Sequence, residues 1–146
     1  MIKAIKAQET LRIRHEVMWP NQALDYVKLA NDEAGLHYGL FDRNTLVSVV
    51  SLFVDGESAQ FRKLATLHEH QGKGHGSQLL SHVFEEAADL GVKRLWCNAR
   101  KNKAHFYQRF GMEETEEVFT KGGIEYVVME ISIGPRDKHL MAEAGF

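Results

Sequence analysis

The chain has 146 residues, of which 44% are hydrophobic and 26% are charged, and its formal net charge is −2 with neutral histidines. These values are typical of one globular domain, and they argue against a nucleic-acid protein held by bulk positive charge, though not against a local basic patch. The longest apolar runs are too short to span a bilayer, the first residues lack the apolar region of a signal peptide, and Cys97 has no second cysteine to pair with. We therefore expect a cytoplasmic protein with no membrane or nucleic-acid partner.

The first half of the chain predicts several strands around one clear helix. The spacing of apolar residues over 9–19 is helical, and Pro20 ends the segment. Residues 25–35 are interpreted as a short helix or a turn, and residues 42–44 as the turn of a hairpin. Strand-like patterns occur in four segments: residues 1–7, 36–42, 45–55 and 58–67.

The second half predicts two helices and two strands. Residues 74–90 have helical spacing, with Gly91 as a stop, and residues 102–111 predict a shorter helix with Asn102 as its N-cap. Strands are predicted at two segments, residues 92–100 and 125–133. The order of strand, helix and strand implies that at least part of the sheet is parallel.

Two segments of this half show no regular pattern. The acidic run at 112–117 is interpreted as a solvated loop. Residues 134–146 have no clear periodicity, and they form either a disordered tail or a segment that packs on a partner subunit.

A glycine-rich stretch lies directly before the longer helix. Gly72, Gly74 and Gly76 alternate with other residues in "HEHQGKGHGSQLLSHVF", residues 68–84, although glycine weakens a helix interior. A helix N-terminus offers unpaired N–H groups and partial positive charge, and glycines let a phosphate approach the backbone. The stretch is therefore a candidate phosphate cradle, with Lys73 adding charge, while a tight strand-to-helix turn explains the spacing equally well. Neither the P-loop nor the Rossmann pattern fits.

Two motifs in this chain resemble those of the GNAT superfamily of N-acetyltransferases. "QGKGHGSQLL" is similar to the signature Q/R-x-x-G-x-G/A, and "NKAHFYQRFGM" is similar to the later motif N-x-x-A-x-x-F-Y-x-x-x-G-F. They lie about thirty residues apart, as in that superfamily, and the resemblance covers roughly residues 40–131. It implies the α/β acyl-CoA N-acyltransferase fold, with a mixed, mostly antiparallel sheet that is splayed in the middle and has helices on both faces. The expected organisation is one domain at 1–133 and a tail at 134–146.

The resemblance implies acetyl-CoA as the cofactor and assigns residues to it. The pyrophosphate would be held by backbone amides of the first motif, which comprises Gln71, Gly72, Lys73, Gly74, His75, Gly76 and Ser77. The Leu64 N–H would hold the acetyl carbonyl, and Ala65 and Thr66 would run beside the pantetheine. Asn102 either contacts the cofactor or only caps its helix.

One tyrosine falls on the general-acid position of the superfamily. Acyl transfer from a thioester needs a neutral amine, donors for the developing oxyanion and an acid for the departing thiolate. Tyr107 matches the tyrosine that the superfamily uses as this acid. The competing interpretation is a packed aromatic residue beside Phe106 and Phe110.

Shorter stretches resemble the small-molecule branch that includes glyphosate N-acetyltransferase. These stretches are "PNQ", "LATL" and "LWCNAR". Arg62 and Arg100 fall where that branch binds an anionic substrate, and arginine grips carboxylates and phosphonates in a bidentate manner. The competing interpretation is two ordinary exposed arginines. The chain departs from the branch at two further substrate-side positions, because Trp19 replaces an arginine and Tyr126 replaces the catalytic-base histidine.

The implied function is transfer of an acetyl group from acetyl-CoA to an amine of a small, anionic metabolite of the amino acid or aminophosphonate type. The general base stays unassigned, with His68 and His70 as weak substitutes, and Cys97 has no role in direct attack. No metal is predicted, and the chain is expected to be a monomer or a homodimer. Two alternatives stay open, namely acetylation of a protein or peptide and a non-catalytic acyl-CoA sensor.

Overall fold

The computed structural model describes residues 1–134, so most of the predicted tail lies outside the described residues. The chain forms two compact units. Unit 1 contains Met1–Phe53 and Phe61–Val83, and unit 2 contains Val54–Gln60 and the chain from Phe84 onward. Strands of the described chain form a seven-stranded sheet in the order β1-β2-β3-β4-β5-β7-β6. Most of the pairings are antiparallel and β4 pairs with β5 in parallel, which confirms the predicted mixed sheet.

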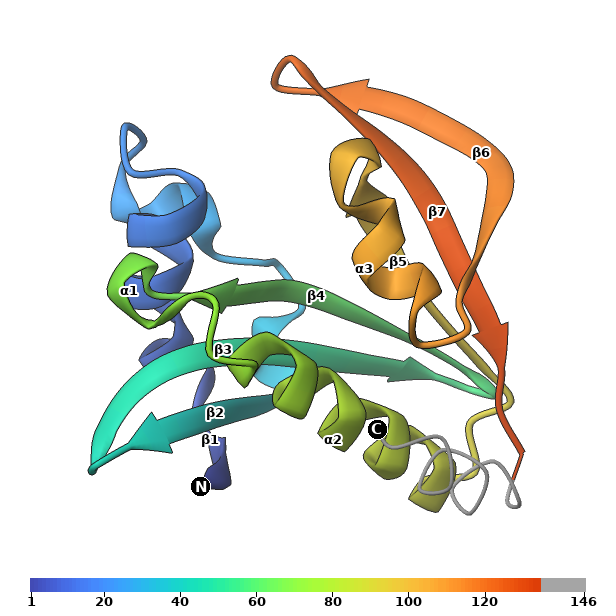
Figure 1. The fold of residues 1–146 in the computed structure, drawn as a ribbon, viewed down its shortest axis with the longest axis horizontal. Helices are drawn as coiled ribbons and strands as arrows, with labels where there is room; N and C mark the ends of the chain where they lie inside the picture. The colour runs from blue at the N-terminus through green and yellow to red at the C-terminus, as the bar shows by residue number, and fades with distance from the viewer. Residues whose placement is uncertain (135–146) are drawn as a thin grey trace. The chain divides into compact units, whose positions relative to one another are not determined.

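Unit 1 begins with a strand, a helix and a hairpin (Figure 1). Its first elements are β1 (Ile2–Ile5), α1 (Ala7–Met18), the short 3₁₀ helices η1 (Leu24–Val27) and η2 (Asp32–Ala34), β2 (Leu36–Asp42) and β3 (Thr45–Asp55). The hairpin turns at Arg43 and Asn44, whose φ angles of 52° and 69° are both left-handed. Such a two-residue turn matches the twist of the strands that it joins. It confirms the turn predicted at 42–44.

The core of unit 1 forms where α1 packs on the strands. Ile13, on the buried face of α1, packs with Val49 of β3, with Ala65 of β4 and with Leu67, the residue that follows β4. All four side chains are almost fully buried. Burial of apolar side chains is the main stabilising term in such a cluster. The packing fixes the end of β4 (Ser58–Thr66), which leads into η3 (His68–His70) and α2 (His75–Asp89).

β4 is irregular at its middle. Its parallel register pairs Ser58–Gln60 with Arg94–Trp96 of β5 (Arg94–Arg100), and the strand then continues to Thr66. Lys63 has a φ angle of +60°, which is uncommon for a residue with a side chain. The chain therefore bends one residue before Leu64, the residue that the resemblance places at the acetyl carbonyl.

Unit 2 is built around an antiparallel sheet (Figure 1). β5 is followed by η4 (Lys101–Lys103), α3 (Ala104–Gln108), β6 (Glu113–Lys121) and β7 (Ile124–Ser132), and β7 lies between β5 and β6. α3 packs against all three strands.

Two sequence-based predictions in this unit are wrong. The run 112–117, predicted as a loop, lies mostly in β6, an edge strand whose residues are almost all exposed and which therefore lacks an apolar face to reveal it. Asn102 does not cap the helix, because α3 begins at Ala104 with Lys103 as its N-cap residue.

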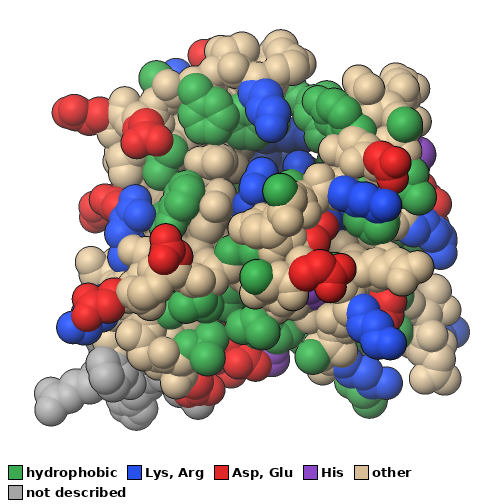
Figure 2. All heavy atoms as spheres, turned by 180° about the vertical axis from the view of Figure 1, so that it is seen from behind, with side chains coloured by type: hydrophobic (Ala, Val, Ile, Leu, Met, Phe, Trp, Pro, Cys, Tyr) green, Lys and Arg blue, Asp and Glu red, His purple; other side chains and the backbone are tan. Residues whose placement is uncertain are grey.

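No helix in residues 1–134 is long and apolar enough to cross a bilayer. Figure 2 shows that positive and negative side chains are interspersed over one face of the molecule. This distribution agrees with the small net charge of the chain.

Candidate active site

The predicted phosphate cradle is a loop that two glycines shape. Gly72 and Gly74 have φ angles of +78° and +84°, in the left-handed region that residues with side chains seldom adopt. No atom lies within 4 Å of a Cβ placed on either glycine, so the backbone conformation, and not crowding, requires glycine there. Gly76 differs from both, because it lies inside the first turn of α2. We call residues 71–77 the glycine loop.

Replacement of Gly74 with alanine tests this interpretation. We expect Gly74→Ala to lower the free energy of unfolding by about 1–2 kcal/mol, because an L side chain strains a left-handed backbone. Lys73→Ala is the matched control, since Lys73 is exposed and has no left-handed φ angle. Chemical denaturation would measure both. Equal stability of the two variants would contradict the proposed role of the backbone conformation.

The end of the glycine loop presents backbone donors. The first helical hydrogen bond of α2 runs from the Gln78 N–H to the Gly74 carbonyl, at 3.0 Å. The N–H groups of the first helical turn have no carbonyl four residues earlier in the helix, and the helix dipole adds partial positive charge. An anion would therefore be stabilised at this position.

The start of the glycine loop is tied to β4. The Gln71 side chain donates a hydrogen bond to the Thr66 carbonyl at 2.9 Å, so Gln71 acts within the protein in this structure. The Thr66 hydroxyl lies 2.7 Å from the Ser48 hydroxyl, which donates to the Ala65 carbonyl at 3.1 Å. These bonds hold the end of β4, and they occupy the backbone carbonyls of Ala65 and Thr66.

A buried charge network lies elsewhere in unit 1, and no local pattern in the sequence indicates it. Arg14 is fully buried, and its guanidinium binds both carboxylate oxygens of Asp32, at 2.9 and 3.0 Å. It also donates to the Val27 carbonyl and to the Ser51 hydroxyl, at 3.1 and 2.9 Å. His37 completes the network, with its ring nitrogens 2.7 Å from that hydroxyl and 2.8 Å from the Asp32 carbonyl.

The electrostatics of this network leave the positive charge near Arg62 uncompensated. Burial acts to raise the pKa of the Asp32 carboxyl, but the hydrogen bonds from Arg14 and from the Leu29 N–H, together with the charges of Arg14 and His37, outweigh burial and lower that pKa. Burial lowers the pKa of the Arg62 guanidinium, the charge of Arg14 lowers it further, and Asp32 opposes both. Asp32 is already bound by Arg14, and within residues 1–134 Arg62 forms no ion pair. An anion would compensate this charge.

Tyr107 of unit 2 is held in its protonated form. Burial raises the pKa of the Tyr107 phenol, the nearby Cys97 raises it further, and the positive charge of Arg100 lowers it. The phenol therefore carries its proton at neutral pH. The ring also contacts Phe106, with centroids 5.1 Å apart, so the packing interpretation is confirmed, and the general-acid interpretation stays a prediction.

Two predicted substrate residues are neighbours in unit 2. Arg100 and Tyr126 are direct cross-strand partners in β5 and β7. The Tyr126 ring stacks on Phe119, with centroids 5.1 Å apart and planes at 11°, and Arg100 forms no ion pair within the described chain. Asn102 is exposed in η4, and burial raises the pKa of the Cys97 thiol, which agrees with its having no chemical role.

Trp19, the remaining predicted substrate residue, lies at the end of α1 in unit 1. Its ring packs edge-on against Tyr26, with centroids 5.2 Å apart. Trp19 and Arg62 are thus residues of unit 1, whereas Arg100 and Tyr126 are residues of unit 2. The structure therefore brings Arg100 and Tyr126 together.

Comparison with known proteins assigns the family. The model of the acetyltransferase (GNAT) domain matches residues 4–133. The uncharacterized N-acetyltransferase YitI of Bacillus subtilis (strain 168) is 32% identical over 138 residues, which cover 88% of this chain and 93% of YitI. The chain therefore belongs to the GNAT acetyltransferase family and is an N-acetyltransferase of that type.

Solved structures agree with the fold. A putative N-acetyltransferase from Lactobacillus plantarum superposes with a TM-score of 0.80 at 19% identity, covering 90% of this chain and 98% of that one. A GNAT family acetyltransferase from Elizabethkingia anophelis, with acetyl-CoA bound, superposes with a TM-score of 0.70 at 18% identity, covering 91% and 97%. The GNAT fold expected from the two motifs is confirmed.

Proposed function

We propose that this enzyme transfers an acetyl group from acetyl-CoA to the amine of a small, anionic metabolite, of the amino acid or aminophosphonate type. The observation that supports an anionic acceptor is the uncompensated positive charge of Arg62. Its guanidinium is partly buried and feels the charge of Arg14, and Asp32, the carboxylate that opposes this effect, is already bound by Arg14. A carboxylate or phosphonate on the acceptor would supply the missing negative charge. Arg100, Tyr126 and Trp19 complete the proposed acceptor residues.

The glycine loop is the proposed site for the pyrophosphate of acetyl-CoA. The left-handed glycines, the donors at the start of α2 and the exposed Lys73 suit a negatively charged group. The backbone of Leu64, Ala65 and Thr66 is proposed to bind the acetyl carbonyl and the pantetheine. Asn102, which is exposed and caps no helix, is available to contact the cofactor.

Tyr107 is the proposed general acid. The acceptor amine attacks the thioester carbon, the carbon–sulfur bond breaks, and the departing thiolate takes the phenol proton. The proton released by the amine passes to solvent, and Tyr107 regains a proton from solvent. The raised pKa of the phenol supports this role, because it keeps the group in its acid form.

The wider organisation is proposed on the same basis. Residues 1–133 would act as one acetyltransferase domain, as a monomer or a homodimer, and the similarity of short stretches to the branch with glyphosate N-acetyltransferase supports a small-molecule acceptor. The single cysteine, Cys97, is compatible with a cytoplasmic location.

The experiment that tests the acceptor class is acetyl-CoA-dependent thiol release with a panel of amines. Turnover restricted to amino acids and aminophosphonates would support the proposal. Turnover on polyamines or aminoglycosides would contradict the acceptor class. Binding of acetyl-CoA without turnover on any amine would contradict it too, in favour of a protein acceptor or a sensor.

A matched pair of arginine variants tests the residue that carries the proposal. We expect Arg62→Gln to lower kcat/KM for an anionic acceptor by about 10–100-fold, because a hydrogen bond to a charged group contributes about 1.5–3 kcal/mol. Arg12→Gln is the control, since Arg12 is 70% exposed and pairs only with Glu16. Equal kcat/KM values for the two variants would remove Arg62 from the acceptor site.

A further inference from the structure

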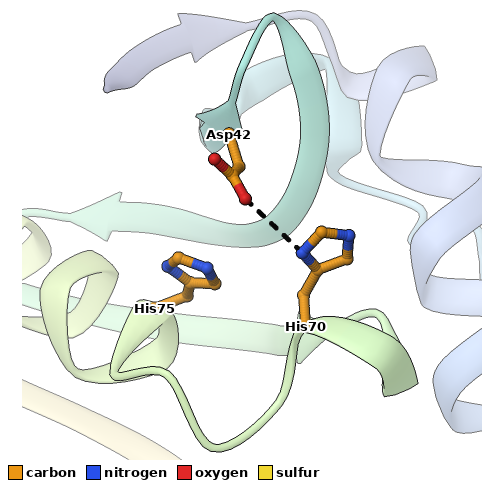
Figure 3. A group of neighbouring side chains, drawn as sticks. All are labelled: Asp42, His70 and His75. Carbon is orange, nitrogen blue, oxygen red and sulfur yellow. Dashed lines mark ion pairs between the residues drawn. The ribbon is translucent and has the colours of Figure 1, made fainter.

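We propose that Asp42, His70 and His75 bind one divalent transition-metal ion, with Zn²⁺ as the best match. The three side chains point toward one another from three different elements of unit 1 (Figure 3). Asp42 is the last residue of β2, His70 is the last residue of η3, and His75 is the first residue of α2. No function assigned above uses these side chains together.

The distances are those of a nearly assembled ligand set. The Asp42 Oδ2 atom lies 3.7 Å from the Nδ1 atom of His70, and one ligand atom from each of the three residues lies within 4.8 Å of the others. Ligands at about 2.0–2.2 Å from a tetrahedral zinc ion are about 3.4 Å apart. A side-chain movement of about 1 Å would therefore close the set around an ion.

The histidine nitrogens lack other partners. The Nδ1 atom of His70 and both ring nitrogens of His75 are buried and accept or donate no hydrogen bond within residues 1–134. Buried polar atoms are normally paired, so an unpaired group of this kind calls for an explanation. Coordination of a metal would use one nitrogen of each ring, and the Asp42 carboxylate would supply negative charge to the ion.

The donor types select the metal. Two imidazoles and one carboxylate suit zinc and its transition-metal neighbours, whereas Mg²⁺ and Ca²⁺ prefer oxygen ligands. Three protein ligands leave a coordination position for water or another oxygen donor.

A bound ion would join three parts of unit 1. His70 and His75 stand on either side of residues 71–74 of the glycine loop, and Asp42 belongs to the hairpin of β2 and β3. The ion would tie both ends of that segment to the hairpin and would restrict its motion. The metal site does not depend on the proposed acceptor or on acetyl-CoA binding, because it rests on side chains alone.

The test is titration of the full-length, chelator-treated protein with Zn²⁺ in the absence of acetyl-CoA. We expect one ion per chain at micromolar or lower concentration, measured by competition with a chromophoric chelator. Zn²⁺ should also raise the melting temperature. Mg²⁺ should neither bind at micromolar concentration nor raise the melting temperature. Co²⁺, used as a spectroscopic probe, should give visible absorption bands of a coordinated site.

Single variants decide whether these residues bind the ion. Asp42→Asn, His70→Gln and His75→Gln should each weaken Zn²⁺ binding by about tenfold or more, since even residues behind the metal ligands contribute that much. His68→Gln is the matched control, because His68 is an exposed imidazole on the same short helix. It should bind Zn²⁺ like the unaltered protein.

Three results would overturn the proposal: no Zn²⁺ binding at micromolar concentration, equal binding by all the variants, or loss of binding in His68→Gln alone. The melting temperature of each metal-free variant is measured as well. A variant that melts like the unaltered protein without metal, yet is not stabilised by Zn²⁺, separates loss of a ligand from loss of the fold.

Discussion

Replacement of Tyr107 with phenylalanine is expected to lower kcat for acetyl transfer by about 100-fold or more, with little change in the KM for acetyl-CoA. The reason is that a positioned acid contributes about 10²–10⁴-fold to such a step, and phenylalanine has no proton to give. The ring and its contact with Phe106 would be kept, so the fold should not change. Steady-state kinetics of thiol release measures the effect.

The pH profile adds a second check on Tyr107. The pKa of a phenol is ordinarily 10.0, and in this protein burial raises it. The acid form therefore persists at every pH up to that ordinary value, so Tyr107 should cause no fall in kcat between neutral pH and pH 10. Tyr26→Phe, the same deletion at an exposed tyrosine, is the control. An unchanged kcat in Tyr107→Phe would show that Tyr107 only packs.

Replacement of Asp32 with asparagine is expected to lower the free energy of unfolding by about 3–5 kcal/mol. Removal of one partner of a buried ion pair leaves the other charge buried without compensation. Arg14 has no exposed surface, and Asp32 binds it through both carboxylate oxygens. Chemical denaturation at neutral pH measures the loss.

The matched control for this variant is Asp25→Asn. Asp25 is 84% exposed and pairs with Lys28 three residues later, and such surface pairs contribute about 0–1 kcal/mol. Similar losses for Asp32→Asn and Asp25→Asn would mean that the Arg14 network does not hold unit 1 together.

The stability that Asp32 supplies should depend on pH in one direction. Its pKa is lower in the folded chain than its ordinary value of 3.8, so the folded state favours the ionised carboxylate. This contribution is fully present above that ordinary value and is lost as the pH falls through the lowered pKa. The difference between the unaltered protein and Asp32→Asn should therefore shrink below about pH 4.

The parts of the fold that were predictable from the sequence have strong local signals. Helical spacing placed a helix at 74–90, and α2 spans His75–Asp89. The turn at 42–44 and the strands beside it were also predictable, because apolar runs and a polar turn alternate there. The glycines indicated the loop correctly. Only at Gly72 and Gly74, however, is the backbone left-handed, and the spacing of the glycines alone does not distinguish these two from Gly76.

The parts that were not predictable depend on contacts between distant residues. Arg12 and Arg14 look alike in the run "LRIRHE", yet Arg12 is exposed and Arg14 is fully buried. Asp32, 18 residues later, supplies the opposite charge that burial of Arg14 requires. The cluster of Asp42, His70 and His75 was missed for the same reason, because no common metal motif has that spacing.

The edge position of β6 bears on how the protein stays dispersed at high concentration. An edge strand presents unpaired backbone groups to which another chain can add, and charged side chains are a common defence. β6 is last in the strand order, its residues are almost all exposed, and four of its first five residues are glutamates. Replacement of those glutamates by neutral β-branched residues would favour edge-to-edge association. Natural selection would then retain these glutamates because they keep the enzyme from associating at its cellular concentration, and not because they affect its catalytic rate.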